Sequence, residues 1–348
     1  MKKILQKITT TWHKKALPCY VISRVPLIMV CYWQDFFNHK EAFAAHCTTD
    51  QPVYLIAMLG WQRETPLRAA ELAAEVHAVA ELAPSIRITF LSNSPVEERL
   101  ITGAGLTSVF CHQNAFLDER RYRVVPAMRK QYDAIYVARI TPFKRHQLAS
   151  GISSLSLIGS WHDYERQHRD AVMQALPAAH WQKKAWAPRM YRHMNAAHTG
   201  LCLSAEEGAM FVSAEYLLCG LPVVSTPNIG GRDHLFTEPF AVTVSPSPQA
   251  VAEGVAWQIG QRHDPQDIRH AVIEKMQYHR SVFRKLVQSI YDAEGLDRDF
   301  ADEWPAVYTH KLGIRCRMPW SKRRQQSLHV LPPLGYADGA DSPRGINV

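Results

Sequence analysis

The stretch that decides the fold is Ser204-Ala-Glu-Glu-Gly-Ala-Met-Phe-Val-Ser-Ala-Glu-Tyr-Leu-Leu-Cys-Gly-Leu-Pro-Val-Val-Ser-Thr226. It reads as a loop, a helix that opens at Gly208, and a strand. Gly220 stands where a left-handed C-cap residue belongs, and Pro222 indicates that the helix has stopped. The β-branched run after it is typical of a strand buried on both faces. Apolar residues recur at helical spacing between these points: Met210, Phe211, Ala214, Leu217 and Leu218.

Two carboxylates bracket the predicted helix, Glu207 at its opening and Glu215 two turns further on. At 3.6 residues per turn they lie about 80° apart around the axis, so both are expected to face one side of a cleft. Carboxylates there accept hydrogen bonds from sugar hydroxyls. Backbone amides at the helix start, from Gly208, Ala209 and Met210, suit a phosphate. The alternative is a pair of solvated glutamates on an amphipathic helix.

The spacing of Glu207 and Glu215, followed by Gly220-Leu-Pro-Val-Val-Ser-Thr226, closely resembles the Glu-x7-Glu signature of retaining glycosyltransferases of the GT-B fold, the large group 1 family numbered four. The resemblance implies an α/β protein with two Rossmann-like domains that face a cleft. It implies that Glu207 contacts the donor sugar and Glu215 contacts the ribose. It further implies that the donor is a nucleotide-diphosphate sugar and that no metal or other cofactor is required.

A second constellation carries positive charge. The run 134–139 predicts a strand that ends at Arg139, and 141–148 predicts a turn that leads into a helix with Lys144 in it. The carboxyl ends of strands are where α/β sheets bind ligands, and two cations there can clamp a diphosphate. The family also carries an Arg and a Lys at these places, both contacting the donor phosphates. Arg145 and His146 are weaker candidates, and ordinary basic surface residues are the alternative.

The segment after the last strand of the stretch contains paired glycines. Gly230 and Gly231 would let backbone amides approach a phosphate or sugar closely, and a plain turn is the alternative. Arg232 adds a cation at the same edge of the sheet. His112 is interpreted as a structural residue between the domains, with a helper role in the chemistry as the alternative.

The chain has 348 residues, enough for two domains. Asn114–Asp118 loosely resembles an Asn-Gly-Val-Asp-like stretch that the family carries where the chain crosses between domains. The N-terminal domain is unusually short for this fold and shows no glycine-rich loop after its first strand. The predicted parts are a reduced acceptor-side domain (1–111), a crossover (112–131), a donor-binding domain (132–262), helices that return in part to the first domain (263–317) and a flexible basic tail (318–348).

Composition narrows the partners. Hydrophobic content of 47% with 21% charged residues is typical of a globular chain, and a net charge of +8 favours anionic partners such as nucleotide sugars, phospholipid surfaces or acidic glycans. No nucleic-acid recognition motif appears, so nucleic acid is excluded as a partner. Seven cysteines without CxxC spacing and seventeen histidines without an HExxH pair give no metal or disulfide pattern, which favours a reducing, cytoplasmic setting.

No apolar run approaches the roughly 20 residues of a membrane span. The basic start, 1–8, is expected to be either a solvated helix or a short amphipathic helix that touches the inner face of a membrane.

The resemblance implies transfer of a sugar from a nucleotide diphosphate to a hydroxyl of a glycan or lipid-linked acceptor, in the synthesis of cell-surface polysaccharide or glycolipid. Two alternatives stay open. One is another GT-B enzyme, an epimerase or a phosphorylase. The other is a non-catalytic, nucleotide-sugar-binding partner of a second glycosyltransferase, which the short N-terminal domain makes worth considering.

Overall fold

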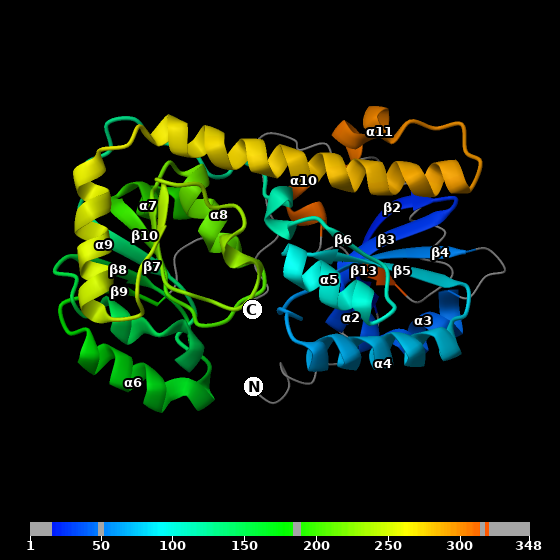
Figure 1. The fold of residues 1–348 in the computed structure, drawn as a ribbon, viewed down its shortest axis with the longest axis horizontal. Coiled ribbons are helices and arrows are strands. Elements are labelled where there is room, and N and C mark those ends of the chain that lie inside the picture. The colour runs from blue at the N-terminus through cyan, green and yellow to red at the C-terminus, as the bar shows by residue number, and fades with distance from the viewer. Residues whose placement is uncertain (1–15, 48–51, 184–188, 314–316, 320–348) are drawn as a thin grey trace.

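The computed structural model describes residues 16–47, 52–183, 189–313 and 317–319. These residues form two α/β lobes, with one long helix lying across both (Figure 1). Within the described residues, no helix is both long enough and apolar enough to cross a membrane. The basic segment 1–8 lies outside the described residues.

The C-terminal lobe is built on a six-stranded parallel sheet with the order β12-β11-β10-β7-β8-β9. Its strands are short and, apart from the two at the edges, mostly buried, as expected of parallel strands covered on both faces. Their bounds are β7 Tyr132–Val137, β8 Leu155–Ile158, β9 His180–Gln182, β10 Ala197–Cys202, β11 Val223–Ser225 and β12 Ala241–Thr243.

Helices cover both faces of this sheet. On one face, α7 (Met190–Asn195) and α8 (Phe211–Leu218) pack with the first half of α10 (Pro265–Ala293). On the other face, α6 (Arg166–Ala175) and α9 (Pro248–Gln261) close the core. The lobe is therefore a three-layer α/β/α sandwich whose strands end at a common edge (Figure 1).

The N-terminal lobe has a five-stranded sheet with the order β2-β3-β4-β5-β6. Only β2 runs antiparallel to its neighbour. The strands are β2 Tyr20–Arg24, β3 Leu27–Tyr32, β4 Val53–Met58, β5 Ile86–Ser92 and β6 Ser108–Phe110. The helices packed on one face are α2 Trp33–Phe37, α3 Lys40–Cys47, α4 Pro66–Leu82 and α5 Pro95–Gly103.

The other face of the N-terminal sheet is covered by the far end of the chain. The second half of α10 and α11 (Phe300–Val307) pack onto it, together with Leu312 of the 3-10 turn η7 (His310–Gly313). Because α10 has 29 residues, it is roughly 43 Å long and contributes to the cores of both lobes. It is the helix along the top of Figure 1.

Local sequence signals explain several helix starts. A polar cap followed by proline begins α4, α9 and α10, where Thr65, Ser247 and Asp264 each accept a hydrogen bond from a backbone amide of the first turn. The predicted tail differs from the structure at its start, because Arg317–Pro319 forms β13, which pairs antiparallel with β1 (Ala16–Pro18). The rest of that tail lies outside the described residues.

Candidate functional site

A cavity of about 470 Å³ opens at the carboxyl ends of β7 and β8, beside the amino end of α8. This is the edge at which parallel α/β sheets bind ligands, and the volume is typical of a ligand pocket. Its lining mixes cations with apolar side chains. The lining residues are Val137, Ala138, Arg139, Phe143, Lys144, Ile158, Gly159, Ser160, Lys183, Met190, Met210, Phe211 and Val212.

Both cations predicted to hold phosphate line this cavity. Arg139 follows β7 by two residues and is exposed, with its Nη1 3.3 Å from Nε2 of His162. Lys144 ends a 3-10 turn that begins at Pro142. The helix predicted to follow the turn at 141–148 does not form here, because Arg145 takes a left-handed conformation (φ 49°) and separates two 3-10 turns. That kink keeps Lys144 at the edge of the sheet.

Glu207 is held against Lys144. The two side chains form an ion pair, and Ser204 Oγ donates a hydrogen bond of 2.5 Å to the same carboxylate oxygen. The Glu207 amide donates to the carbonyl of Ile229 at 3.0 Å, and the residue is only 6% exposed. A buried charge of this kind persists where it is paired and hydrogen-bonded. The structure thus brings Glu207, Lys144 and Arg139 to one place.

The helix α8 begins later than predicted, at Phe211, because Met210 has φ 46° and cannot continue a helix backwards. Gly208 and Ala209 therefore belong to a loop, and the rotation expected between the two glutamates does not apply. Asn114 Nδ2 fixes this loop by donating to the carbonyls of Ala209 (2.8 Å) and Met210 (3.2 Å). The amino end of α8 still faces the cavity through Phe211.

Glu215 lies apart from this group. It is buried in α8, accepts a hydrogen bond of 2.8 Å from the Tyr122 hydroxyl, and lies 3.9 Å from Lys311 Nζ. Burial raises the pKa of Glu215, and the neighbouring Lys311 and Tyr122 act against that rise. It is not among the residues that line the cavity. The role at the ribose implied for Glu215 stays a prediction.

Gly230 and Gly231 lie where chain segments approach one another closely. Gly230 has φ 116°, and a Cβ there would overlap the carbonyl oxygen of Glu207. A Cβ on Gly231 would collide with Asn93 of the N-terminal lobe. The Gly230 amide already donates to Glu64 Oε2 at 3.1 Å. Neither glycine lines the cavity, so the need for glycine here comes from packing, and the predicted donor contact stays a prediction.

Arg232 was predicted as a further cation at the edge of the sheet, and the structure corrects this interpretation. Its side chain is fully buried and pairs with Asp233 at 2.7 Å. Its guanidinium also donates to the carbonyls of Ser204 (2.9 Å) and Thr226 (2.6 Å) and to Ser225 Oγ (2.6 Å). These bonds tie together the ends of β10 and β11, so Arg232 is structural.

The three weaker candidates are also structural. Arg145 donates to the carbonyls of Leu203 (2.6 Å) and Ser204 (3.0 Å), and burial lowers the pKa of His146 to about 3. His112 is fully buried and accepts at Nδ1 from the Asn114 amide, 3.2 Å away. Its Nε2 therefore carries the proton and donates to the Gly231 carbonyl at 2.9 Å. Burial lowers the pKa of His112 to about 3, so it is a neutral link between the lobes.

No motif in the sequence marks the segment that faces the site from the N-terminal lobe. We call residues 59–65, between β4 and α4, the facing loop. Glu206 Oε1 accepts from Trp61 Nε1 (3.1 Å), from Gln62 and from Arg68 at the start of α4. Trp61 also packs edge-on against Phe143 of the cavity, with ring centroids 5.1 Å apart. The position of the facing loop directly after a parallel strand is the feature of the sequence that could have indicated its role.

Among the described residues, no three His, Cys, Asp or Glu side chains gather as a metal site. The prediction that no metal is required stays a prediction.

No protein-family model matches the chain, and no curated protein matches it significantly. Solved structures do. HepE from Anabaena in complex with UDP superposes with a TM-score of 0.55 over 69% of this chain and 72% of that chain, at 15% identity. Sucrose-phosphate synthase from Thermosynechococcus elongatus gives 0.55 over 76% and 74%, at 14% identity.

TarM from S. aureus, in complex with UDP among other ligands, gives a TM-score of 0.56 at 13% identity. That match covers 75% of this chain and only 54% of the TarM chain. Likenesses at this level of identity show the fold. Together with the six-stranded parallel sheet of one lobe and the mostly parallel sheet of the other, they place this chain in the GT-B fold of two facing Rossmann-like domains.

Proposed function

We propose that this protein is a retaining glycosyltransferase that moves a sugar from a nucleotide diphosphate to a hydroxyl acceptor. One observation carries the proposal: two cations, Arg139 and Lys144, line one cavity on the ligand-binding edge of a GT-B sheet, and Lys144 pairs there with the buried carboxylate of Glu207. The solved structures of HepE and TarM with UDP support a uridine nucleotide as the first donor to test.

The diphosphate would lie against Arg139, Lys144 and the amino end of α8. When the bond between the anomeric carbon and the phosphate oxygen breaks, the electron pair of that bond stays on the leaving diphosphate. Fixed cations and a helix dipole stabilise this charge without reorganising. The acceptor oxygen would attack on the same face, and its proton would pass to the leaving phosphate. The products are then a glycoside and a nucleoside diphosphate.

Glu207 would hold hydroxyls of the transferred sugar. Its ion pair with Lys144 and its bond from Ser204 leave the carboxylate fixed at the edge of the cavity, which suits an orienting role. Glu215 would hold the ribose after Lys311 and Tyr122 yield or share the carboxylate. The facing loop would form the acceptor side, with the partly exposed Trp61 offering a flat apolar surface to a sugar ring.

The acceptor class proposed is a glycan or lipid-linked hydroxyl in cell-surface polysaccharide or glycolipid synthesis, and the proposed location is the cytoplasm. Arg139, Lys144 and the amino end of α8 favour a nucleotide-diphosphate donor over the free phosphate that a phosphorylase binds, because a diphosphate engages both cations at once.

The first test is a thermal shift of the purified chain against UDP-, GDP-, ADP-, TDP- and CMP-linked sugars. A ligand at about 100 times its dissociation constant adds roughly 2.7 kcal/mol of stability. We expect one nucleotide class to stabilise the wild type and to lose this effect in Lys144→Ala. Lys285→Ala, an exposed lysine of α10, is the matched control. If none of these donors shifts the melting temperature of a folded sample, the proposed donor site is contradicted.

Turnover then separates the remaining alternatives. Release of the nucleoside diphosphate with a new glycoside on the acceptor supports the transferase. An altered sugar on the same nucleotide indicates an epimerase, and a sugar phosphate formed with inorganic phosphate indicates a phosphorylase. Donor binding with no turnover on any acceptor supports the non-catalytic partner.

A further inference from the structure

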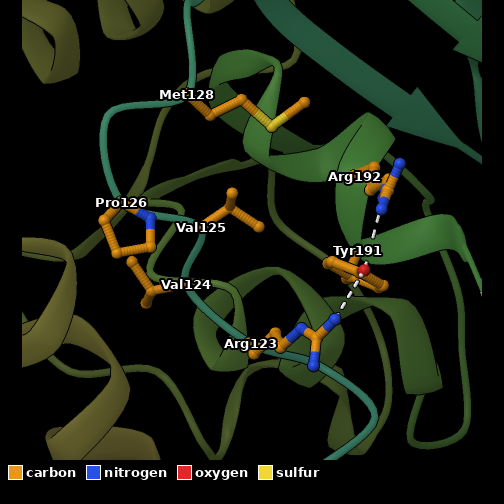
Figure 2. Close-up of a pocket in the computed structure, with 7 residues that line it drawn as sticks. All are labelled: Arg123, Val124, Val125, Pro126, Met128, Tyr191 and Arg192. Carbon is orange, nitrogen blue, oxygen red and sulfur yellow. Dashed lines mark hydrogen bonds between the residues drawn. The ribbon is translucent and has the colours of Figure 1, made fainter.

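A second cavity of about 470 Å³ lies between the crossover segment and α7, and the proposed function does not use it. Figure 2 shows the apolar side chains of the crossover segment on one side and a tyrosine between two arginines on the other. The lining residues are Arg123, Val124, Val125, Pro126, Met128, Tyr191 and Arg192. Met190, the preceding residue of α7, lines the donor cavity instead, so the two cavities are separate.

The walls of this cavity are fixed to one another. Asn195, which is only 4% exposed, accepts a hydrogen bond from the Val125 amide at 2.8 Å. Its Nδ2 donates to the carbonyls of Arg123 (2.9 Å) and Tyr191 (2.7 Å). One buried amide therefore joins the crossover segment to α7. A cavity held in this way is formed before a ligand arrives.

Two positive charges share one oxygen in this cavity. Arg123 Nη2 donates to the Tyr191 hydroxyl at 2.8 Å, and Arg192 Nε donates to the same oxygen at 3.3 Å (Figure 2). The bonds from Arg192 and Arg123 lower the pKa of Tyr191. A phenol near neutral pH does not balance two guanidinium groups. Within the part of the chain that the structure describes, neither arginine has a carboxylate partner, as none of the ion pairs there involves them.

The surroundings add further positive charge. The crossover segment also carries the exposed Arg129, and no acidic residue lies between 120 and 132. Guanidinium groups bind phosphate oxygens bidentately, which makes an anion the fitting ligand. A free phosphate would leave the apolar wall of Val124, Pro126 and Met128 against water. A phosphate ester with an apolar chain would cover that wall and meet both cations.

We propose that this cavity binds the phosphate headgroup and proximal chain of an anionic lipid, and thereby holds the chain on a membrane surface through its C-terminal lobe. Arg123 and Arg192 take the phosphate, and the side chains of the crossover segment pack on the first methylenes of the lipid. The proposal does not depend on the donor site, because no residue lines both cavities.

The test measures binding of the full chain to vesicles by flotation. Phosphatidylcholine vesicles are compared with vesicles that contain about one third phosphatidylglycerol. We expect preference for the anionic vesicles, and a loss of about tenfold or more in Arg123→Gln/Arg192→Gln, since each basic residue at the surface is worth about 1 kcal/mol. The control is Arg99→Gln/Arg262→Gln, which removes the same charge from exposed sites elsewhere and should change binding less than about twofold.

Two further arms make the outcome decisive. Met128→Gln keeps every charge and should still weaken binding to anionic vesicles by about threefold, because it removes apolar area from the cavity wall. Arg192→Gln alone, at an exposed position, serves if the double variant does not fold. Equal losses in the charge control, or no effect of Met128→Gln, would assign the binding to diffuse electrostatics. Binding of inorganic phosphate by the wild type without vesicle preference would assign the cavity to a free anion. Either result overturns the proposal.

Discussion

The two lobes meet at the candidate site through segments of different kinds. The C-terminal lobe supplies charged side chains whose positions follow from a recognisable spacing, Glu207 in a loop and Lys144 in a turn. The N-terminal lobe supplies the facing loop, which contacts Glu206 through the indole of Trp61 and the side-chain amide of Gln62. The charged residues proposed to bind the donor can therefore be predicted from their spacing in the sequence. The surface proposed to bind the acceptor depends on contacts between segments that are far apart in the sequence.

The largest effect should come from removing the charge of Lys144 from the proposed donor cavity. Lys144→Ala is expected to lower kcat/KM for sugar transfer by about a thousandfold, because a positioned charge at the leaving group acts mainly in the transition state. Steady-state kinetics against Lys285→Ala, which should match the wild type, measures it. A loss of less than tenfold would mean that Lys144 serves the loop through Glu207 and does not touch the donor.

A smaller effect, on stability and not on catalysis, is expected from replacing Arg232 in the C-terminal lobe. Arg232→Met leaves Asp233 and several carbonyls without their donor, so we expect a loss of about 3 kcal/mol in the free energy of unfolding. Urea denaturation gives this value. Donor affinity of the folded fraction should change little. If affinity falls as far as it does in Lys144→Ala, Arg232 would belong to the donor site after all.

On the N-terminal side, Glu97 gives a pH-dependent prediction. Its carboxylate accepts from the amides of Arg63 (2.7 Å) and Asn93 (2.7 Å), and burial raises its pKa to about 7 from 4.5. Because the folded-state pKa is the higher one, stability from this group is full below about pH 4.5 and is lost as pH rises through 7. The loss is on the order of 2–3 kcal/mol.

Glu97→Gln removes that titration. We expect the melting temperature of the variant, relative to the wild type, to rise between about pH 4.5 and pH 7 and to level off above pH 7. Thermal unfolding followed by circular dichroism at several pH values tests this. Parallel curves for the two proteins would show that the carboxyl group titrates as it does in the unfolded chain.

The smallest effect should come from the contact between the two sides. Glu206→Gln weakens the bonds from Arg68, Gln62 and Trp61 but keeps the shape of the side chain. A partly exposed ion pair contributes about 1 kcal/mol or less, so we expect up to a fivefold rise in KM for the acceptor with kcat nearly unchanged. A change in donor affinity alone would mean that the facing loop shapes the donor cavity and not the acceptor side.

Part of the fold follows from the sequence. The run 134–139 predicts the strand observed at Tyr132–Val137, and Gly220 and Pro222 correctly predict the end of a helix before the buried strand β11. The start of α8 does not follow, because the left-handed Met210 depends on the grip of Asn114 on the preceding loop. The role of Arg232 was also missed. The sequence does not distinguish a basic residue that is exposed at the ligand-binding edge of a sheet from one that is buried beneath that edge. Only the burial of the side chain in the structure distinguishes them.

The candidate site shows the same division. Arg139, Lys144 and Glu207 lie within about 70 positions of one another, and a known motif marks them. Trp61 and Glu206 are separated by 145 positions, and their contact depends on how the two lobes pack. No periodicity or spacing predicts such a contact from a single sequence.

The long helix α10 has a consequence for the order in which the protein is made. The N-terminal sheet is complete once Phe110 has left the ribosome, yet most of the described residues that cover one of its faces belong to the segment from Val282 onward. Until the second half of α10 has been translated, Ile28, Ile56 and Leu91 lack most of the apolar side chains that cover them in the folded protein. Such a nascent lobe presents an apolar surface that attracts chaperones and other chains. A stall during translation of α10 should therefore favour aggregation of the nascent chain.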